Sequence, residues 1–181
     1  MLEQNGCYRI RQRLSQRRGL PPEIVEQLLH DADPSIRSEL AGSPFAPDVV
    51  LIPLSRDLDP SVRNEVAQNR KTPLRVLSDL AGDKSAIVRA SAAGNPRLDA
   101  TSMRNLVGDD DMVRVRLAAN HSCPPDVLKT LSTEGGPDVR QAVAANSSSP
   151  PDVLQQLSSD EQSWTNPVVS KTRHSQTRAT Q

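Results

Sequence analysis

Residues 59–70 read DPSVRNEVAQNR, and the same frame returns at four other places in the chain. The other copies are DPSIRSELAGSP (33–44), SAIVRASAAGNP (85–96), DMVRVRLAANHS (111–122) and PDVRQAVAANSS (137–148). Their arginines are spaced by 26, 26, 25 and 26 residues and are Arg37, Arg63, Arg89, Arg114 and Arg140. Self-similarity at a fixed period is the signature of a repeat architecture. We therefore expect a stack of similar units in place of one central core.

Each unit predicts two short helices. Upstream of each arginine lies a segment with two apolar residues three apart, such as Leu51 and Leu54, often opened by a proline. Proline is favoured in the first turn of a helix, and this apolar spacing gives one buried stripe. The second segment starts with Asp-Pro in two copies (Asp33 and Asp59), which indicates an N-cap followed by the first helical residue. Helices this short need their neighbours for stability.

The fold class that follows is all-α, a helical solenoid of about five to six two-helix repeats. The approximate repeats are 20–44, 45–70, 71–96, 97–122, 123–148 and 149–170. Residues 1–19 are interpreted as a degenerate half-repeat whose helix, over 8–17, forms a basic cap. Residues 163–170 are expected to form a fading terminal helix, and residues 171–181 a disordered basic tail.

Composition agrees with thin helical layers. The chain has 181 residues, only 35% of them hydrophobic, and only three aromatic residues. Its formal net charge is zero, but both ends are basic, so the body carries an excess of acid. The two cysteines form no CxxC pair, which favours free thiols in a reducing compartment. No apolar run reaches the roughly 18–20 residues that span a bilayer, and the N-terminus lacks a signal peptide's apolar stretch. A cytoplasmic location is therefore expected.

The combination of this period with PPDVLxxL and DxxVRxxVAxN resembles the leucine-rich repeat variant (LRV) family of bacteria, over roughly residues 20–160. The resemblance implies a right-handed superhelix in which an α-helix alternates with a short second helix, often 3₁₀, without strands. HEAT-type stacking is the nearest alternative. Some members of the family hold an iron–sulfur cluster on four N-terminal cysteines. Only Cys7 is present in that region here, so no cluster is expected.

The arginine column has two interpretations. Stacked helices would place its guanidinium groups about 10 Å apart, a spacing that suits phosphates or an acidic peptide. Alternatively, each arginine pairs with an acid of its own or a neighbouring repeat, and Asp33, Asp59 and Asp110 lie four residues before an arginine. A ligand site usually varies between copies, so the regular recurrence favours the structural interpretation.

Two further groups of residues stand out. An asparagine row follows the arginines at a constant offset, in the positions Asn69, Asn95, Asn120 and Asn146. Asparagine tolerates the left-handed conformation at helix ends, and its amide can satisfy loop backbone groups, so we interpret the row as structural. The basic cap consists of Arg9, Arg11, Arg13, Arg17 and Arg18. On a helix, Arg9, Arg13 and Arg17 would share one face, either to contact an acidic partner, nucleic acid or lipid, or to solubilise the end.

No catalytic or cofactor site is predicted. The histidines, His30, His121 and His174, share no metal-binding spacing, and the acidic run 109–111 is more typical of a solvated loop. No nucleophile, zinc or nucleotide-binding motif is present. We expect a non-catalytic scaffold that binds another protein, with basic patches preferred on that partner. The alternative is binding of a nucleic-acid backbone through the arginine column and the basic termini, which zero net charge and few aromatic residues disfavour.

Overall fold

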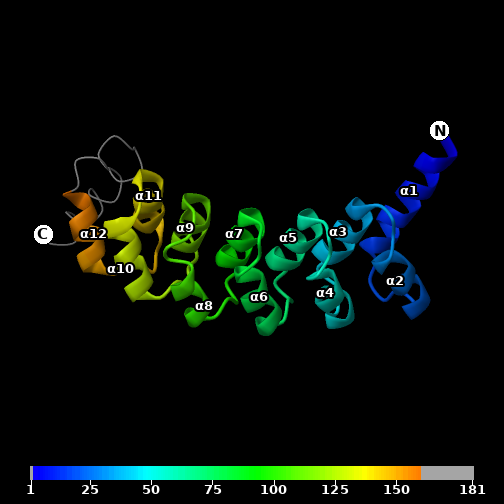
Figure 1. Cartoon of the computed structure of the whole chain (residues 1–181), viewed down its shortest axis with the longest axis horizontal. Coiled ribbons are helices and arrows are strands. Elements are labelled where there is room, and N and C mark those ends of the chain that lie inside the picture. Colours follow the sequence, from blue (N-terminus) through cyan, green and yellow to red (C-terminus); the bar gives the residue numbers. More distant parts are fainter. Residues whose placement is uncertain (1, 160–181) are drawn as a thin grey trace, which may run out of the picture. The chain divides into compact units, whose positions relative to one another are not determined.

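The computed structural model describes the backbone of residues 2–159 and the side chains of residues 8–159. Within that range the chain is all-α, with twelve helices and no strand, which confirms the helical-repeat class (Figure 1). The chain divides into two compact units, unit 1 (residues 1–97) and unit 2 (residues 98–181). The terminal helix expected over 163–170 and the tail expected over 171–181 lie outside the described residues.

The helices of unit 1 form two rows (Figure 1). They are α1 (Leu2–Ser15), α2 (Pro22–Leu29), α3 (Pro34–Gly42), α4 (Asp48–Leu54), α5 (Pro60–Gln68), α6 (Leu74–Ala81) and α7 (Ala86–Gly94). The odd-numbered helices contact one another in sequence order, from α1 to α3, α5 and α7. The even-numbered helices pack on them from one side, so each pair of helices contacts the next pair.

Unit 2 repeats this arrangement. Its helices are α8 (Ala100–Asn105), α9 (Asp111–Ala118), α10 (Pro125–Glu134), α11 (Pro137–Ala145) and α12 (Pro151–Ser158). Helix α9 contacts α11, and α10 contacts α12, which are the contacts of equivalent helices in successive repeats. The repeat therefore governs packing in both units.

Proline and aspartate start the helices as the sequence indicates. In α3 and α5 the carboxylates of Asp33 and Asp59 accept hydrogen bonds from the backbone N–H groups of Ser35 and Ser61, at 2.9 and 2.8 Å. Proline follows each cap at the first helical position, where a missing N–H costs no hydrogen bond. The interpretation of Asp-Pro as N-cap and first helical residue is confirmed.

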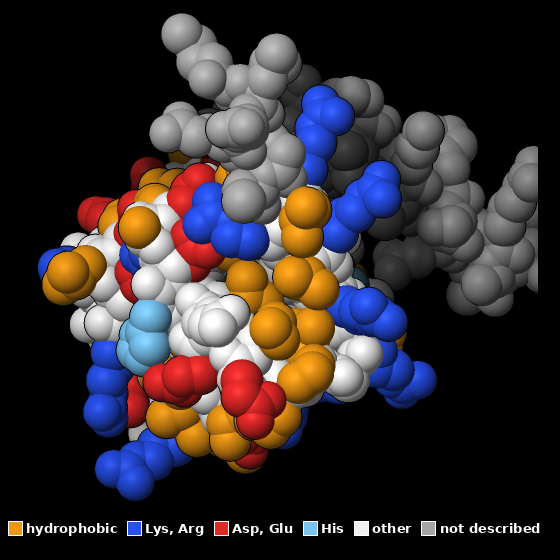
Figure 2. All heavy atoms as spheres, turned by 90° about the vertical axis from the view of Figure 1, so that its right-hand side faces the viewer, with side chains coloured by type: hydrophobic (Ala, Val, Ile, Leu, Met, Phe, Trp, Pro, Cys, Tyr) orange, Lys and Arg blue, Asp and Glu red, His pale blue; other side chains and the backbone are white. Residues whose placement is uncertain are grey.

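The core consists of one thin apolar layer per repeat. The residue before each column arginine is completely buried in all five copies, which are Ile36, Val62, Val88, Val113 and Val139. The equivalent residue of the half-repeat, Ile10, is 61% exposed. Figure 2 looks onto this end of unit 1, where hydrophobic side chains form a continuous band. Burial of a stripe thus depends on the neighbouring helices, as nearest-neighbour stacking requires.

Two expectations about the helices are wrong. The second helix of each repeat is α-helical in the described residues, as α3, α5, α7, α9 and α11 show, and not 3₁₀. Each of these helices runs for eight or nine residues. The cap helix α1 spans Leu2–Ser15 and not 8–17, so Arg17 lies outside it and cannot share its face with Arg9 and Arg13.

Replacing Ile36 and Ile10 separately by alanine tests nearest-neighbour burial at one repeat position. Ile36→Ala leaves a cavity in a closed layer and is expected to lower the free energy of unfolding by about 3 kcal/mol. Ile10→Ala removes the same atoms from an exposed site and is expected to change it by less than about 0.5 kcal/mol. Urea denaturation followed by circular dichroism measures both. Equal losses would show that repeat position, and not covering by neighbours, sets the stability.

Candidate functional site

The asparagine row ties successive turns together. In unit 1 the Asn69 Nδ2 donates to the carbonyl oxygens of Ala41 and Ser43 in the preceding repeat, at 2.7 and 2.9 Å. Its Oδ1 accepts from the backbone N–H of Lys71 in its own turn, at 2.9 Å. Asn95 makes the equivalent bonds in unit 1, and Asn146 makes them in unit 2. Asn120 likewise accepts from the N–H of Ser122.

The asparagines do not serve as left-handed helix ends. The φ angles of Asn69, Asn95 and Asn146 lie between −66° and −77° and their ψ angles between 121° and 123°, which is extended backbone. Asparagine is suited to the position because one short side chain carries two N–H donors and one acceptor. The carbonyls that it satisfies belong to the previous repeat, and burial leaves them no access to bulk water.

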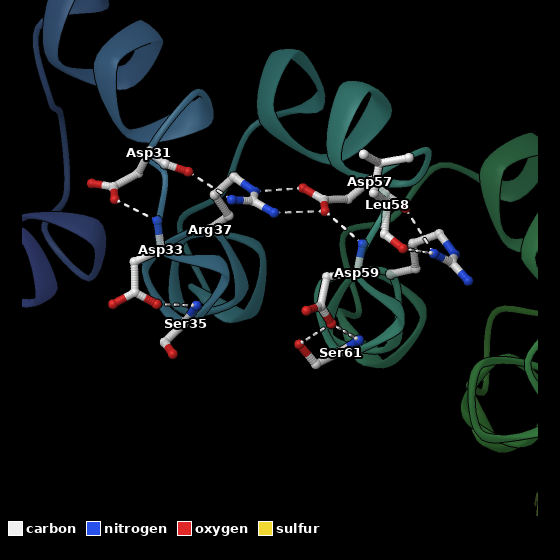
Figure 3. Close-up of polar contacts among 9 residues, drawn as sticks. Asp31, Asp33, Ser35, Arg37, Asp57, Leu58, Asp59 and Ser61 are labelled. Atoms are coloured by element: carbon white, nitrogen blue, oxygen red, sulfur yellow. Dashed lines mark hydrogen bonds and ion pairs between the residues drawn. The ribbon is translucent and has the colours of Figure 1, made fainter.

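In unit 1, Arg11, Arg37 and Arg63 form a ladder of ion pairs between repeats, and Figure 3 shows the pair of Arg37 with Asp57. Arg37 donates from Nε and Nη2 to the two carboxylate oxygens of Asp57, at 2.6 and 2.9 Å. Arg63 donates in the same way from Nε and Nη2 to the two carboxylate oxygens of Asp83, at 2.7 and 2.9 Å. Arg11 of the half-repeat donates from Nη1 to both carboxylate oxygens of Asp31, at 2.8 Å each. Every partner lies 20 residues after its arginine.

Arg37 and Arg63 also hold the turns that precede their own helices. Arg37 donates from Nη1 to the carbonyl oxygen of Asp31, and Arg63 to that of Asp57, at 2.6 and 2.7 Å. Asp57 is thus bound twice, through its carboxylate by Arg37 and through its carbonyl by Arg63 (Figure 3). One guanidinium therefore joins its own turn to the turn of the next repeat.

The partners expected from the sequence, Asp33 and Asp59, are wrong. Their carboxylates cap α3 and α5, and the ladder uses the aspartate two residues earlier, whose carboxylate also accepts from the N–H of the cap residue. The missed signal is an acid 20 residues after every frame arginine. These acids are Asp31, Asp57, Asp83, Asp109, Glu134 and Asp160. The spacing to the next repeat, and not the four-residue spacing within a helix, identifies the partner.

The remaining arginines keep the contact with a turn carbonyl. Arg89 donates from Nη1 to the carbonyl oxygen of Asp83 at 3.0 Å. In unit 2, Arg140 donates to that of Gly135 at 2.6 Å. Arg114 pairs with Asp111, one residue from the expected Asp110, and reaches the carbonyl oxygen of Glu134 at 3.4 Å.

Burial and pairing shift the titration of the ladder. The side chains of Arg63 and Asp83 are only 5% and 9% exposed. The hydrogen bonds that Arg63 donates to Asp83 raise the pKa of Arg63 above its usual value. Burial raises the pKa of Asp83, but the hydrogen bonds from Arg63 and from the Ser85 N–H outweigh it, and the net shift is downward. A phosphate that approached Arg37 or Arg63 would compete with a bidentate carboxylate already in place.

The residues of the basic cap separate into three places. Arg11 belongs to the ladder, whereas Arg9 and Arg13 are exposed on α1. Arg17 and Arg18 are exposed in the turn after α1. The guanidinium carbon of Arg18 lies 4.9 Å from the centre of the Phe45 ring. The cap is therefore not one basic face of a single helix.

Unit 1 contains an acidic groove of about 490 Å³ beside the ends of α1 and α3. Its lining comprises Gln16, Ser38, Glu39, Gly42, Ser43, Pro44 and Glu65. The carboxylate of Glu65 lies over Gly42, where an added Cβ would come within 2.8 Å of Glu65 Oε2. Burial raises the pKa of Glu65. Glu39 differs because Gln12 and Ser15 donate to it, at 2.5 and 3.3 Å.

The described residues offer little for catalysis. Cys123 is buried, and burial raises the pKa of its thiol to about 12, so the reactive thiolate is scarce at neutral pH. The described side chains, those of residues 8–159, bring together no group of three histidine, cysteine or acidic residues that could hold a metal ion. Within the same range no helix has the length and apolar character for crossing a membrane. His174 lies outside the described residues.

Replacement of Asn69 by alanine tests the hydrogen bonds between turns. The change deprives the carbonyls of Ala41 and Ser43 of their side-chain donor and is expected to cost about 2 kcal/mol of unfolding free energy. Asn105→Ala, at an exposed position of α8, is the matched control and is expected to be near neutral. Chemical denaturation measures both variants, and equal effects would remove the special role of the row.

Replacement of Arg63 by methionine tests the ladder. It leaves the Asp83 carboxylate poorly solvated and unpaired, so we expect a loss of about 3 kcal/mol. Arg75→Met, at an exposed position of α6, is the control and should have little effect.

Acid provides the second readout of the ladder. Asp83 has a lowered pKa in the folded state, so its contribution to stability is complete above the ordinary aspartate pKa of 3.8. That contribution is lost as the pH falls through the lowered value. Asp83→Asn should therefore flatten the loss of stability below pH 3.8, whereas an unchanged acid profile would contradict the pairing.

Comparison with known proteins gives one match. Residues 88–147, about a third of the chain, match the Leucine Rich Repeat Variant domain. No curated protein and no solved structure matches the chain. The matched stretch holds three of the five column arginines and three of the four row asparagines, the positions that also define the remaining copies. Residues 88–147 are therefore similar to the Leucine Rich Repeat Variant domain.

Proposed function

We propose that this protein is a non-catalytic scaffold that binds a basic segment of another protein in the acidic groove of unit 1. The observation that carries the proposal is the Glu65 carboxylate, which has no hydrogen-bond or ion-pair partner among the described residues and borders the groove. Desolvation disfavours its charged form. A cationic side chain in the groove would supply the missing counter-charge.

The backbone around the groove adds to its negative potential. Helices α1 and α3 end at Ser15 and Gly42, next to Gln16 and Ser43 of the lining. The C-terminus of a helix carries partial negative charge on its last carbonyls and favours a nearby cation. Two carboxylates and two helix ends therefore act in the same direction. A lysine or arginine is the side chain that this arrangement suits.

The division of labour within the repeat supports a binding role. The row asparagines and the ladder arginines recur at fixed positions of the repeat, with Ser43 in the asparagine place of the first copy, and they make contacts between turns. The two groove carboxylates are not at frame positions, since the places of Glu39 and Glu65 hold Ser91 and Arg116 in other copies. Solenoids use such variable surface positions to select partners while the frame keeps the fold.

Nucleic-acid binding through the arginine column receives less support. Arg37 and Arg63 are held by carboxylates and by turn carbonyls, so phosphate binding would break the contacts that join the repeats. Each phosphate contact would also require the release of an ion pair. The cytoplasmic location and the bacterial origin stay predictions.

Glu65→Gln tests the scaffold proposal with a fluorescein-labelled peptide of alternating lysine and serine as the probe. Because the carboxylate is unpaired and desolvated, the variant should be at least as stable as wild type at neutral pH, so that weaker binding cannot reflect unfolding. We expect the peptide to bind roughly tenfold more weakly to the variant at low salt. Wild-type affinity should fall as acid protonates Glu65, which begins above the usual glutamate range because its pKa is raised.

Glu23→Gln is the matched control, since Glu23 is exposed in the first turn of α2. It removes the same charge outside the groove lining and should leave the affinity nearly unchanged. If both variants weakened peptide binding equally, the effect would come from net charge, and the groove would be rejected as the binding site. Absence of saturable binding by the wild type would reject it as well.

A further inference from the structure

The edge of unit 1 that carries the asparagine turns is strongly basic. It comprises the turns 16–21, 43–47 and 69–73, together with the turn that reaches Arg97, and we call it the basic edge. Its cations are Arg17, Arg18, Arg70, Lys71 and Arg97, all of them exposed. The first three turns contain no acidic residue, and the nearest acids in the sequence, Glu23 and Asp48, belong to the first turns of α2 and α4.

The opposite turns have a different composition. They contain the ladder aspartates Asp31, Asp57 and Asp83, whose charge is met by Arg11, Arg37 and Arg63. The ladder therefore balances the charge of one edge within unit 1. In the described residues, no carboxylate forms an ion pair with a cation of the basic edge. Arg97 donates to a backbone carbonyl, and Lys71 lies over an aromatic ring.

Phe45 lies at the centre of this edge. Its ring is 41% exposed, although aromatic side chains are scarce in this protein and large apolar ones are usually covered. The Arg18 guanidinium lies 4.9 Å from the ring centre, and the Lys71 ammonium lies 5.9 Å from it. Cations from the preceding and the following turn thus flank one exposed ring. At an exposed site such contacts contribute only about 0.5–1 kcal/mol each, so a ligand can displace them.

A groove of about 270 Å³ opens beside this ring. Most of its walls are apolar and are formed by Leu20, Val25, Leu40, Ala46, Pro47 and Val50, with Arg17 and Phe45 also in the lining. Its volume suits one apolar side chain. Val49, which follows the turn on α4, is 68% exposed and extends the apolar surface. In the end view of unit 1, Lys and Arg side chains border the hydrophobic band on one side (Figure 2).

We infer that the basic edge binds an acidic protein segment, one of whose apolar side chains enters the groove beside Phe45 while its carboxylates meet Arg17, Arg18 and Lys71. Charge complementarity selects an acidic partner because the turns 16–21 and 69–73 present cations and the turn 43–47 between them contains no acid. The aliphatic groove selects an aliphatic or aromatic anchor, since a nucleic-acid backbone has no group that would fill it. One aromatic side chain also offers little stacking for a row of bases. The groove beside Phe45 adjoins the acidic groove, with which it shares Ser43 in the lining, but it calls for a partner of opposite charge.

The test uses a fluorescein-labelled peptide of glutamate and aspartate with a central Leu-Leu-Phe, measured by fluorescence anisotropy on the full chain. Wild type should bind it saturably, and raised salt should weaken the binding. Arg18→Glu, at an exposed turn position, should weaken it by roughly tenfold or more, and Phe45→Ser should have a similar effect. Arg116→Glu, which makes the same charge change at an exposed position of α9, is the control and should change the affinity little.

Three further probes separate the explanations. The same peptide with serines in place of its central apolar residues should bind much more weakly, and equal binding would reduce the edge to a nonspecific basic surface. Tighter binding of oligo-dT that depends on Arg18 and Phe45 would assign the edge to nucleic acid and overturn the inference. No saturable binding of the acidic peptide, with Arg18→Glu and Phe45→Ser lowering only the stability, would show that the cations merely clamp the turns.

The lysine–serine peptide of the proposed function distinguishes the two sites. Arg18→Glu removes a positive charge and should leave the binding of this basic peptide intact or slightly strengthen it. Phe45→Ser changes no charge and should leave it intact. Glu65→Gln should not weaken the binding of the acidic peptide. Failure of one peptide alone therefore rejects one site and leaves the other standing.

Discussion

Every repeat of this protein depends on polar groups that its own residues do not satisfy. The carbonyls of Ala41 and Ser43 receive their side-chain donor from Asn69, which belongs to the next repeat. The carboxylate of Asp57 is held by Arg37 of the repeat before it. Because burying an unpaired polar group costs more than a hydrogen bond gains, two adjacent repeats are favoured to be ordered together. Apolar burial gives the stack its energy, and these contacts fix its register.

This constraint explains how far the sequence could predict the fold. The five copies share period, apolar stripe and caps, so all-α repeats and the Asp33 and Asp59 caps follow from pattern alone. The expectation that the asparagines adopt a left-handed conformation is wrong. An asparagine side chain can bond to turn backbone at positive or at negative φ, so the residue type alone does not determine φ. The helix over 8–17 was misplaced because a degenerate repeat offers few frame residues to fix its ends.

The site was less accessible to sequence reasoning. The ladder partners were sought within one helix, whereas the structure uses contacts 20 residues apart, and only the stacking geometry shows which acid reaches an arginine. Neither groove carries a motif. The acidic groove joins side chains of α3 and α5 with the turn after α1, and Phe45 is a single departure from the frame. Features that occur once in a repeat protein leave no periodic signal, although selection for binding acts on those features.

Zero net charge consequently says little about the partners of this chain. Charges in the ladder neutralise one another in pairs and are screened from solvent by their burial. The charges left to act on a partner are the unmatched ones, which include the Glu65 carboxylate in the groove and the cations around Phe45 on the basic edge. Physiological salt screens such fields beyond about one Debye length, roughly 8–10 Å, so each acts most strongly on the groups that contact it. A chain that is neutral in total can thereby present two local surfaces of opposite sign, each selecting a different kind of segment.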